Sequence, residues 1–328
     1  MRVVLIGVGH WHTPFYLDPC LALPDVAVVG VSDPDPARAA AVAAHAGCPS
    51  FTDAAALCAQ ARPDFAFVLG RHCDMAASAR LLIALRIPFA IEKPGGVTAA
   101  EVADLAARAA AAGCFAAVPF VFRDSALLDA IRAAAPGERV QVASFKFIGG
   151  LVERYRAEGC DWMLSHATAG GGALLNLGIH FLDLARALLP GATLRVSAAA
   201  RSNATAGLDI EDHAVVLLEG GGARCLVETG YLYPAPHSVF DLHYSLRTER
   251  HFFAVRGPDA LEISDDSRAR RVVALPTINA PLYPGFVADV LARAARGAPP
   301  VAGLGELAAA VALVEAAYAA APLPPVER

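Results

Sequence analysis

The chain has 328 residues, of which 56% are hydrophobic and 18% are charged, and its formal net charge is −5. This length exceeds one typical domain, so we expect two. The composition supports a large core and excludes a disordered chain. The lack of Lys and Arg clusters argues against nucleic acid as a partner, and no apolar segment approaches the ~18–20 residues of a membrane span.

The N-terminus and the cysteines favour a cytoplasmic protein. The chain enters a predicted strand almost at once and lacks the charged lead and long apolar stretch of a signal peptide. Its seven cysteines form no C-x-x-C pair. An odd, scattered set of this kind is typical of reduced thiols.

Apolar, β-branched runs alternate with alanine-rich stretches in the first third of the chain. The predicted strands are Arg2–Ile6, Val26–Ser32, Phe65–Leu69, Pro88–Ile91 and Phe115–Val118. The predicted helices are Pro34–Ala46, Asp53–Ala61, Asp74–Leu85 and Thr98–Ala112. Asp33 and Thr98 are candidate N-caps, and Gly47 and Gly113 are candidate C-terminal caps. This alternation predicts βαβ units, and hence one doubly wound domain over residues 1–120 with a parallel sheet buried on both faces.

The turn after the first strand, residues 7–12, reads G-V-G-H-W-H. Two glycines at this spacing let the backbone approach a pyrophosphate at a helix N-terminus. His12 replaces the third glycine of the pattern, so we expect the helix to start late, with Thr13 as its N-cap. The candidate cofactor contacts in this turn are Gly7, Gly9, His10, Trp11 and His12. For His10 and His12, plain loop histidines remain the alternative.

Asp33 ends the second predicted strand, 26 residues after Gly7. This is near the separation expected for the acid that binds a ribose hydroxyl. A carboxylate there repels the 2′-phosphate of NADP, so we favour NAD, although Arg38 in the next helix can soften the preference. The alternative role is a helix cap, and the two roles can coexist.

Three histidines in this part of the chain, at positions 10, 12 and 72, raise the question of a metal. They have no nearby Cys or Glu at a recognised zinc spacing. We therefore expect no metal.

Residues 88–96 read P-F-A-I-E-K-P-G-G. An apolar run stops at Glu92 and Lys93, and Pro94 prevents the strand from continuing. The carboxyl ends of strands in open α/β sheets border the crevice where ligands bind, so Lys93 is a candidate site residue. The alternative is a solvated surface lysine.

A second informative stretch follows a predicted helix at residues 124–135 and a predicted strand at Arg139–Phe147. After three glycines, the segment that ends at residue 189 is apolar nearly all round, which predicts a buried helix. Asn176, His180 and Asp183 are spaced i, i+4 and i+7, on one face. Buried polar groups need partners, so this stripe is either a closed structural network or a site. Gly178 favours the close approach of another group, because glycine inside a helix costs roughly 1 kcal/mol relative to alanine.

The rest of the chain predicts a sheet followed by two helices. The predicted strands are Thr193–Arg201, Asp212–Glu219, Arg224–Leu232, Ser238–Leu246, Glu249–Val255 and Ala260–Ile263. Hairpin turns are expected at residues 219–222 and 248–249, and helices at Leu282–Arg296 and Leu304–Ala320. We therefore expect an α/β protein whose second domain, residues 121–328, is α+β with a large, mainly antiparallel open sheet. The Val- and Leu-rich strands suggest a partner subunit on its second face.

Three features resemble the glucose–fructose oxidoreductase and inositol dehydrogenase family (Gfo/Idh/MocA) over essentially the whole chain. They are the Gly7-x-Gly9 turn with Asp33, the sequence Glu92-Lys93-Pro94, and the segment 170–183. The resemblance implies a Rossmann domain followed by an open-sheet domain, and NAD or NADP as cofactor. It also implies homodimers or homotetramers built through the sheet, and sugars, cyclitols or related polyols as substrates.

The resemblance also implies roles for single residues. Lys93 would stabilise a developing alkoxide and His180 would accept the proton, while hydride passes to the nicotinamide. Glu92, Gly70 and His72 occupy family positions near the cofactor. The positions implied near the substrate are Arg123, Trp162, Asn176 and Asp183.

Three positions depart from the family pattern. Asn176 stands where an aspartate is usual, and an amide cannot take a proton. Gly70-Arg71-His72 replaces a T-P-N sequence, and His12 replaces a glycine.

We favour an NAD-dependent dehydrogenase acting on a hydroxyl, because both Lys93 and His180 are retained. Two alternatives stay open. One is a lyase or glycosidase that removes and returns hydride with no net redox change. The other is a non-catalytic sugar- or nucleotide-sensing protein with a degenerate site.

Overall fold

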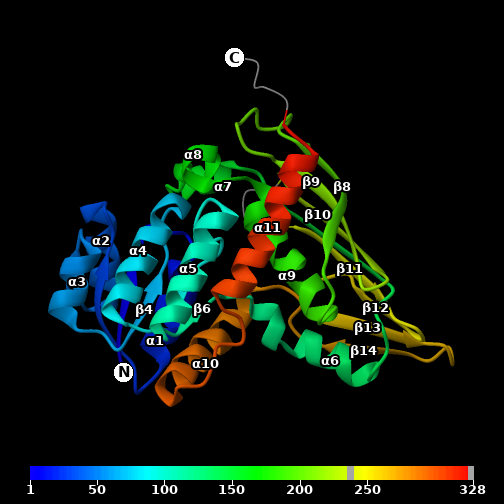
Figure 1. The fold of residues 1–328 in the computed structure, drawn as a ribbon, viewed down its shortest axis with the longest axis horizontal. Coiled ribbons are helices and arrows are strands. Elements are labelled where there is room, and N and C mark those ends of the chain that lie inside the picture. Colours follow the sequence, from blue (N-terminus) through cyan, green and yellow to red (C-terminus); the bar gives the residue numbers. More distant parts are fainter. Residues whose placement is uncertain (235–239, 324–328) are drawn as a thin grey trace.

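The computed structural model describes residues 1–234 and 240–323, which form two β-sheets with helices around them (Figure 1). The first sheet has six parallel strands in the order β3-β2-β1-β4-β5-β6. These strands are β1 (Arg2–Ile6), β2 (Ala27–Ser32), β3 (Ser50–Phe51), β4 (Phe65–Val68), β5 (Phe89–Ile91) and β6 (Ala116–Ala117). The predicted doubly wound parallel sheet is therefore confirmed, with the short strand β3 added at its edge.

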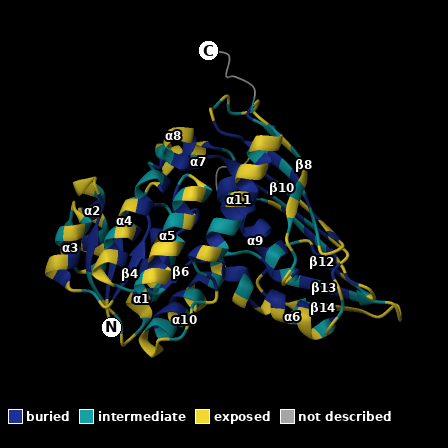
Figure 2. Cartoon of the chain, in the orientation of Figure 1, coloured by how far each residue is buried: buried dark blue, intermediate teal, exposed yellow. Residues whose placement is uncertain are grey.

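Successive side chains of the central strands enter two different cores. Val4 and Ala66 belong to one hydrophobic cluster, whereas Val3 and Phe65 belong to another. This is the result expected when side chains alternate across a sheet that is covered on both faces. The covering helices are buried toward the sheet and exposed on their outer sides (Figure 2).

The helices of this part are α1 (Thr13–Ala22), α2 (Pro36–Ala46), α3 (Ala54–Ala61), α4 (His72–Leu85) and α5 (Ala99–Ala112). The late start of α1 is confirmed, but its N-cap is His12 rather than Thr13, whose hydroxyl donates to the carbonyl of Val8. Thr98 caps α5 as predicted, accepting from the amide of Glu101 at 3.2 Å.

Gly47 and Gly113 are the left-handed C-caps of α2 and α5, as predicted. The prediction that Asp33 caps α2 was wrong. Asp35 is the cap, because the chain runs two residues beyond Asp33 before α2 begins, and its side chain accepts from the amide of Ala37 at 2.9 Å.

The second sheet has eight strands in the order β14-β13-β12-β11-β7-β10-β9-β8. Its strands are β7 (Val142–Gly150), β8 (Arg195–Ser202), β9 (His213–Gly220), β10 (Ala223–Tyr233), β11 (Asp241–Arg247), β12 (His251–Val255), β13 (Ala260–Asp265) and β14 (Arg270–Ala274). All neighbours pair antiparallel except β7 and β10. The expected mainly antiparallel sheet is confirmed. The first two residues of the predicted strand Ser238–Leu246 lie outside the described residues.

Strand β14 was not predicted. It lies at the edge of the sheet and begins with Arg270 and Arg271, so it lacks the apolar alternation of a half-buried strand. Charged residues are common on edge strands because they discourage pairing with another chain.

Helix α6 (Ala126–Ala134) connects the two sheets, whereas α7 (Glu153–Ala157), α8 (His166–Ala169) and α9 (Ile179–Leu188) lie between β7 and β8 of the second sheet. The C-terminal helices α10 (Tyr283–Arg296) and α11 (Leu304–Ala320) then return to the first sheet, where α10 packs on α1 and α11 packs on α5. Tyr283 and Val287 of α10 share a core with Tyr16 of α1. The end of the chain therefore helps to build the surroundings of the first sheet.

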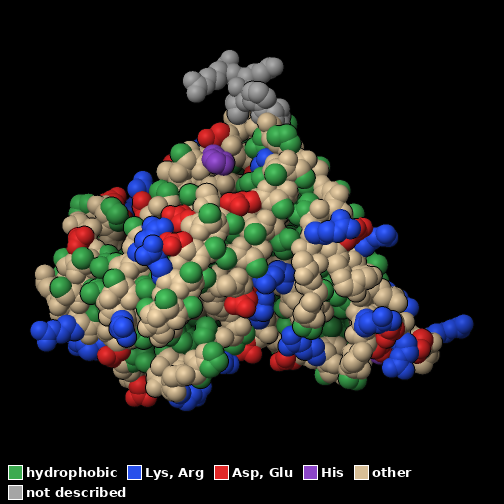
Figure 3. Space-filling model, in the orientation of Figure 1, with side chains coloured by type: hydrophobic (Ala, Val, Ile, Leu, Met, Phe, Trp, Pro, Cys, Tyr) green, Lys and Arg blue, Asp and Glu red, His purple; other side chains and the backbone are tan. Residues whose placement is uncertain are grey.

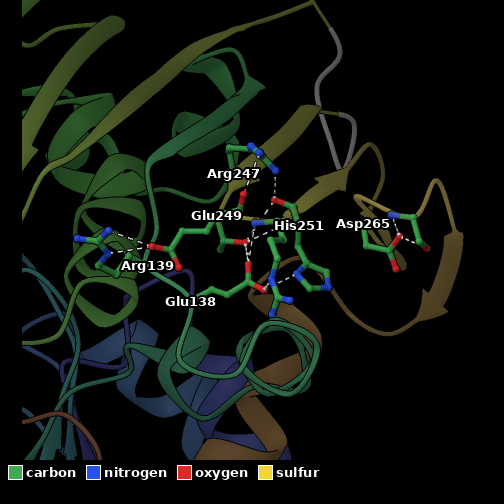
Figure 4. A network of polar contacts seen from close by, with 9 residues as sticks. Glu138, Arg139, Arg247, Glu249, His251 and Asp265 are labelled. Carbon is green, nitrogen blue, oxygen red and sulfur yellow. Dashed lines mark hydrogen bonds and ion pairs between the residues drawn. The ribbon is translucent and has the colours of Figure 1, made fainter.

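Glu138, in the loop before β7, fixes the predicted turn between β11 and β12 (Figure 4). Its carboxylate accepts from the Thr248 hydroxyl at 2.7 Å and lies 2.9 Å from Nδ1 of His251. The hydrogen bond from Thr248 is the main reason that the pKa of Glu138 falls to about 2. Long-range polar contacts of this kind hold the far end of the large sheet in register.

No helix in the described part of the chain is both long and apolar enough to cross a membrane. Figure 3 shows Lys and Arg interspersed with Asp and Glu over the face in view. That face therefore carries no continuous basic surface of the kind that nucleic acid requires.

Candidate functional site

A cavity of about 560 Å³ lies at the carboxyl ends of β1, β2 and β4, and Gly7, Gly9, Asp33, Gly70 and Trp162 are among its lining residues. Gly7 has a φ of +77°, and a Cβ atom there would lie 2.7 Å from the Cα atom of Gly70. Only glycines allow these two turns to meet so closely. Four of the predicted cofactor contacts, Gly7, Gly9, Asp33 and Gly70, therefore line the same cavity.

Asp33 is held against the glycine turn by its carboxylate. Oδ2 accepts from the amide of Gly9 at 2.7 Å, and Oδ1 accepts from the amide of Asp35 at 3.0 Å. A Cβ atom on Gly9 would lie 2.9 Å from Oδ2, so the turn needs glycine at this position too. The glycine turn can contact a pyrophosphate, and the neighbouring carboxylate can bind a ribose hydroxyl. This arrangement fits NAD.

Arg38 crosses this cavity from α2. Its guanidinium donates to the carbonyl of Gly9 at 2.9 Å and to the carbonyl of Gly159, which follows α7. The side chain therefore links the dinucleotide turn to the second part of the chain.

A cluster of aromatic rings lies between this cavity and a second one. Trp162 lines the first cavity, whereas Trp11 and His12 line the second. The ring of His10 contacts all three, with centroids 5.6 Å from Trp162, 6.1 Å from Trp11 and 5.0 Å from His12. Burial holds the pKa of His10 well below its ordinary value and lowers that of His72 to about 3, so both rings are neutral.

One carboxylate oxygen of Glu92 accepts three hydrogen bonds. Oε1 lies 2.8 Å from Nδ1 of His12 and accepts from the hydroxyls of Tyr16 at 2.8 Å and Tyr283 at 3.0 Å. Burial by itself raises the pKa of Glu92, but the interaction with His12 more than offsets this effect, and the pKa of Glu92 lies well below its ordinary value. Burial lowers the pKa of His12. Because the carboxylate accepts at Nδ1, Nε2 of His12 carries the lone pair.

Lys93 is buried, with 1% of its surface exposed, so the alternative of a solvated surface lysine is wrong. Its Nζ donates to Oδ1 of Asn176 at 2.6 Å and to the backbone carbonyl of the same residue at 3.0 Å. Burial lowers the pKa of Lys93 to about 8, against the opposing charge of Glu92. The amine can therefore be protonated or neutral near physiological pH.

Asn176 is saturated by its neighbours. Its amide nitrogen donates to the hydroxyls of Tyr155 at 2.6 Å and Tyr231 at 3.1 Å. The amide therefore joins the lysine to two tyrosines, with no polar atom left over for a proton-transfer role.

His180 lines the second cavity, which has a volume of about 240 Å³ and is otherwise mostly aromatic. Both ring nitrogens are buried and lack a hydrogen-bond partner within the described residues. Burial, followed by the charge of Lys93, lowers the pKa of His180 to about 3, so the ring is neutral. A neutral imidazole without partners can accept a proton from a ligand in this cavity.

The segment that carries these residues differs from the expected regular helix. Leu174–Gly178 forms a π-helical turn before α9, a feature frequent at functional sites. Gly178 permits close approach to β10, as its sequence context suggested, since a Cβ atom would lie 3.3 Å from Oγ1 of Thr229.

Asp183 does not share a partner with Asn176. Its carboxylate accepts two hydrogen bonds from Arg123, both at 2.8 Å, and each charge neutralises the other. Two of the four residues implied near the substrate therefore form an ion pair with each other.

The described ranges contain no group of three or more His, Cys, Asp or Glu side chains that could hold a metal ion. All seven cysteines are unpaired thiols.

Two family models match this chain. Residues 1–120 match the oxidoreductase family with an NAD-binding Rossmann fold, and residues 139–252 match the GFO/IDH/MocA C-terminal domain. The chain belongs to the Gfo/Idh/MocA family of oxidoreductases. This membership confirms the resemblance, the assignment to an oxidoreductase family and NAD as the cofactor of the first domain.

A curated relative, the putative UDP-kanosamine synthase oxidoreductase subunit of Amycolatopsis mediterranei, is 31% identical over 199 residues. The match spans 60% of this chain and 54% of that protein, so it covers about half of the relative's length.

Similar folds occur among solved structures. The UDP-N-acetylglucosamine 3-dehydrogenase of Acidithiobacillus ferrooxidans has a TM-score of 0.80 at 21% identity, covering 98% of this chain and 97% of that one. The inositol dehydrogenase homologue of Azotobacter vinelandii, complexed with NAD+, has a TM-score of 0.83 at 19% identity, covering 98% and 95%. At these identities the likeness shows the fold.

Sequence reasoning missed the residues that support the site. Tyr16 and Tyr283 bind Glu92, whereas Tyr155 and Tyr231 bind Asn176. They lie far apart in the chain and follow no motif. Arg154, which also lines the second cavity, was missed for the same reason.

Proposed function

We propose that this protein is an NAD-dependent dehydrogenase that oxidises a hydroxyl group of a sugar, cyclitol or related polyol. One observation carries the proposal: Asn176 binds the amine of Lys93, and His180, four residues later, lines a cavity while both its ring nitrogens lack a partner among the described residues. The names of two structural relatives, a UDP-N-acetylglucosamine 3-dehydrogenase and an inositol dehydrogenase homologue, agree with this reaction class.

Each residue has a distinct role in the proposed reaction. Bound NAD supplies the hydride acceptor, and Gly7, Gly9 and Asp33 hold its adenosine and pyrophosphate end. Protonated Lys93 stabilises the alkoxide that develops as the hydroxyl loses its proton. Neutral His180 accepts that proton. Asn176 acts as a positioning residue by fixing the lysine.

A binding or sensing role is the second candidate, and the ring of His10 favours it. This ring lies between the two cavities, in contact with the lining residues of both. A site that stays divided in this way would bind nucleotide and sugar without transferring hydride between them. A lyase or glycosidase with no net redox change is a third possibility of the same fold.

The first experiment is a calorimetric titration of the purified protein with NADH and, separately, with NADPH, after a check for co-purified nucleotide. We expect micromolar binding of NADH and much weaker binding of NADPH, because Asp33 repels a 2′-phosphate.

A screen of sugars, cyclitols and polyols with NAD then follows, with absorbance at 340 nm as the readout. Accumulation of NADH supports the dehydrogenase. Product formation without NADH would indicate the lyase or glycosidase. Binding without any turnover would favour the sensing role.

We also propose the division into residues 1–120 and 121–328, and a homodimer or homotetramer formed through the large sheet. Four of its exposed large apolar side chains support the oligomer: Val142, Leu226, Phe252 and Val272. Arg247 of β11 pairs with Val142 on one side and with Phe252 on the other, so these two apolar groups flank the same position of the sheet. Light scattering after size exclusion tests the assembly.

The seven free thiols support a cytoplasmic location.

A further inference from the structure

Arg154, the second residue of α7, brings a positive charge to the second cavity, which His12 and His180 also line. Its guanidinium lies over three aromatic rings, with Cζ 5.8 Å from the centroid of Trp11, 4.6 Å from that of Tyr155 and 5.5 Å from that of Tyr231. One terminal nitrogen donates to the hydroxyl of Tyr155 at 2.5 Å. The rings hold the side chain in one orientation.

No carboxylate pairs with this guanidinium in the described ranges, and its Nε is buried without an acceptor. Residues 235–239, which precede Phe240 of the cavity wall, contain no Asp or Glu by sequence. The contrast with Arg123 is direct, because Arg123 is neutralised by Asp183 through two hydrogen bonds of 2.8 Å.

The aromatic contacts offset only part of the cost of this charge. A cation–π contact stabilises a guanidinium only modestly, whereas the removal of an ion from water is costly and a buried donor without an acceptor adds to that cost. The nearby charges do not help, since Lys93 is also cationic and Glu92 is already bound by His12 and two tyrosines. The cavity therefore contains a positive charge that no carboxylate of the described residues neutralises, and an anionic ligand would stabilise it.

We propose that Arg154 is an anion-binding residue, and that the ligand of the second cavity is a sugar or polyol that carries an oxyanion, a carboxylate or a phosphate. The planar guanidinium suits either group, because its parallel N–H donors match two oxygens. The cavity volume of about 240 Å³ limits the ligand to roughly one ring. This inference rests on the proposed function for the position of the reacting hydroxyl, but the anion subsite itself does not.

The test is calorimetric binding to the full chain of three probes: D-glucuronate, D-glucose 6-phosphate and the neutral parent D-glucose. We expect at least one acidic probe to bind at least ten-fold more tightly than glucose. Preference for glucuronate identifies a carboxylate as the anion, and preference for glucose 6-phosphate identifies a phosphate.

Substitution separates Arg154 from general surface charge. Arg154→Met should lower the affinity for the preferred acid at least ten-fold and leave that for glucose within two-fold. The matched control is Arg156→Met, since Arg156 is exposed two residues later and pairs with Glu153, and this variant should bind as the wild type does. Arg154→Lys keeps the charge without the planar guanidinium, so its affinity for the preferred acid should lie between those of the wild type and Arg154→Met. This variant also tests the proposal if Arg154→Met does not fold.

Equal affinity for acids and glucose, no binding of either acid, or unchanged acid binding in Arg154→Met would overturn the proposal. The outcome is independent of the redox assignment, because no turnover is measured. If acid binding depends on Arg154 but the screen of sugars, cyclitols and polyols produces no NADH, the anion subsite stands and the dehydrogenase is rejected.

Discussion

The amine of Lys93 lies 2.6 Å from Oδ1 of Asn176, in a buried site where the family usually has an aspartate. The amide neutralises none of the lysine charge, and burial lowers the pKa of Lys93 to about 8. The protonation state of the lysine is therefore sensitive to pH in a range where the enzyme can be assayed. This relationship leads to the first two predictions.

Asn176→Asp should shift the pH profile. If protonated Lys93 is required, kcat/KM of the wild type falls as the pH rises through about 8. A carboxylate in contact with the amine favours its charged form and raises the pKa, so the falling limb should move to higher pH in the variant. The measurement is kcat/KM against pH for both proteins. A limb that stays in place would show that another group controls it.

Lys93→Met should reduce kcat by at least about 10²-fold, since this is the usual cost of losing one stabilising group at a developing oxyanion. NADH affinity should stay within a few-fold, because the amine contacts Asn176 rather than the first cavity. The control is the same substitution at Lys146, the only other lysine of the sequence, which lies on β7 beside Asp241. Full activity of Lys93→Met would remove the main support for the dehydrogenase.

Glu92→Gln should destabilise the fold by roughly 2–4 kcal/mol, because hydrogen bonds to a charged group contribute about 1.5–3 kcal/mol each and three donors share Oε1. The folded pKa of Glu92 lies below its ordinary value, so this stabilisation is present above pH ~4.5 and is lost as the pH falls through the folded pKa. Urea unfolding at pH 7 and at steps from pH 4.5 down to pH 3 measures it, and the loss for Glu92→Gln should shrink over those steps. Tyr283→Phe, which removes one donor and keeps the charge, should cost less. A loss for Glu92→Gln that is equally large in acid would contradict the assignment of a charged carboxylate.

NAD and ADP-ribose should have different effects on tryptophan fluorescence. The only two tryptophans, Trp11 and Trp162, both contact the ring of His10 between the two cavities. A ligand whose nicotinamide end reaches Lys93 must displace these rings, whereas ADP-ribose can bind in the first cavity without doing so. We expect a larger change with NAD than with saturating ADP-ribose, because Trp162 lines the first cavity and senses both ligands whereas Trp11 lines the second, and a reduced change with either ligand in Trp162→Phe. Identical responses would mean that the ring cluster stays closed and would favour a sensing protein.

Much of the architecture could be predicted from the sequence because it follows from local rules. The alternation of apolar runs and alanine-rich stretches predicted the parallel sheet, and Gly7, Gly9 and Asp33 predicted the cavity that they share. The misplaced cap of α2 shows the limit of such rules, since Asp33 and Asp35 are equally good caps by residue type. The unpredicted strand β14 shows it too, because an edge strand needs no apolar alternation.

The sequence by itself determined the family and most of the order of elements, and it singled out Lys93 and His180 as candidate site residues, because motif spacing and hydrophobic period are properties of contiguous residues. Only the tertiary structure decided what surrounds them. Glu92 meets Tyr16 across 76 residues and Tyr283 across 191 residues, and Arg154 of α7 reaches the same cavity as His12, the N-cap of α1. Such contacts depend on where distant elements pack, and burial, rather than residue type, sets the charge of each group in the site.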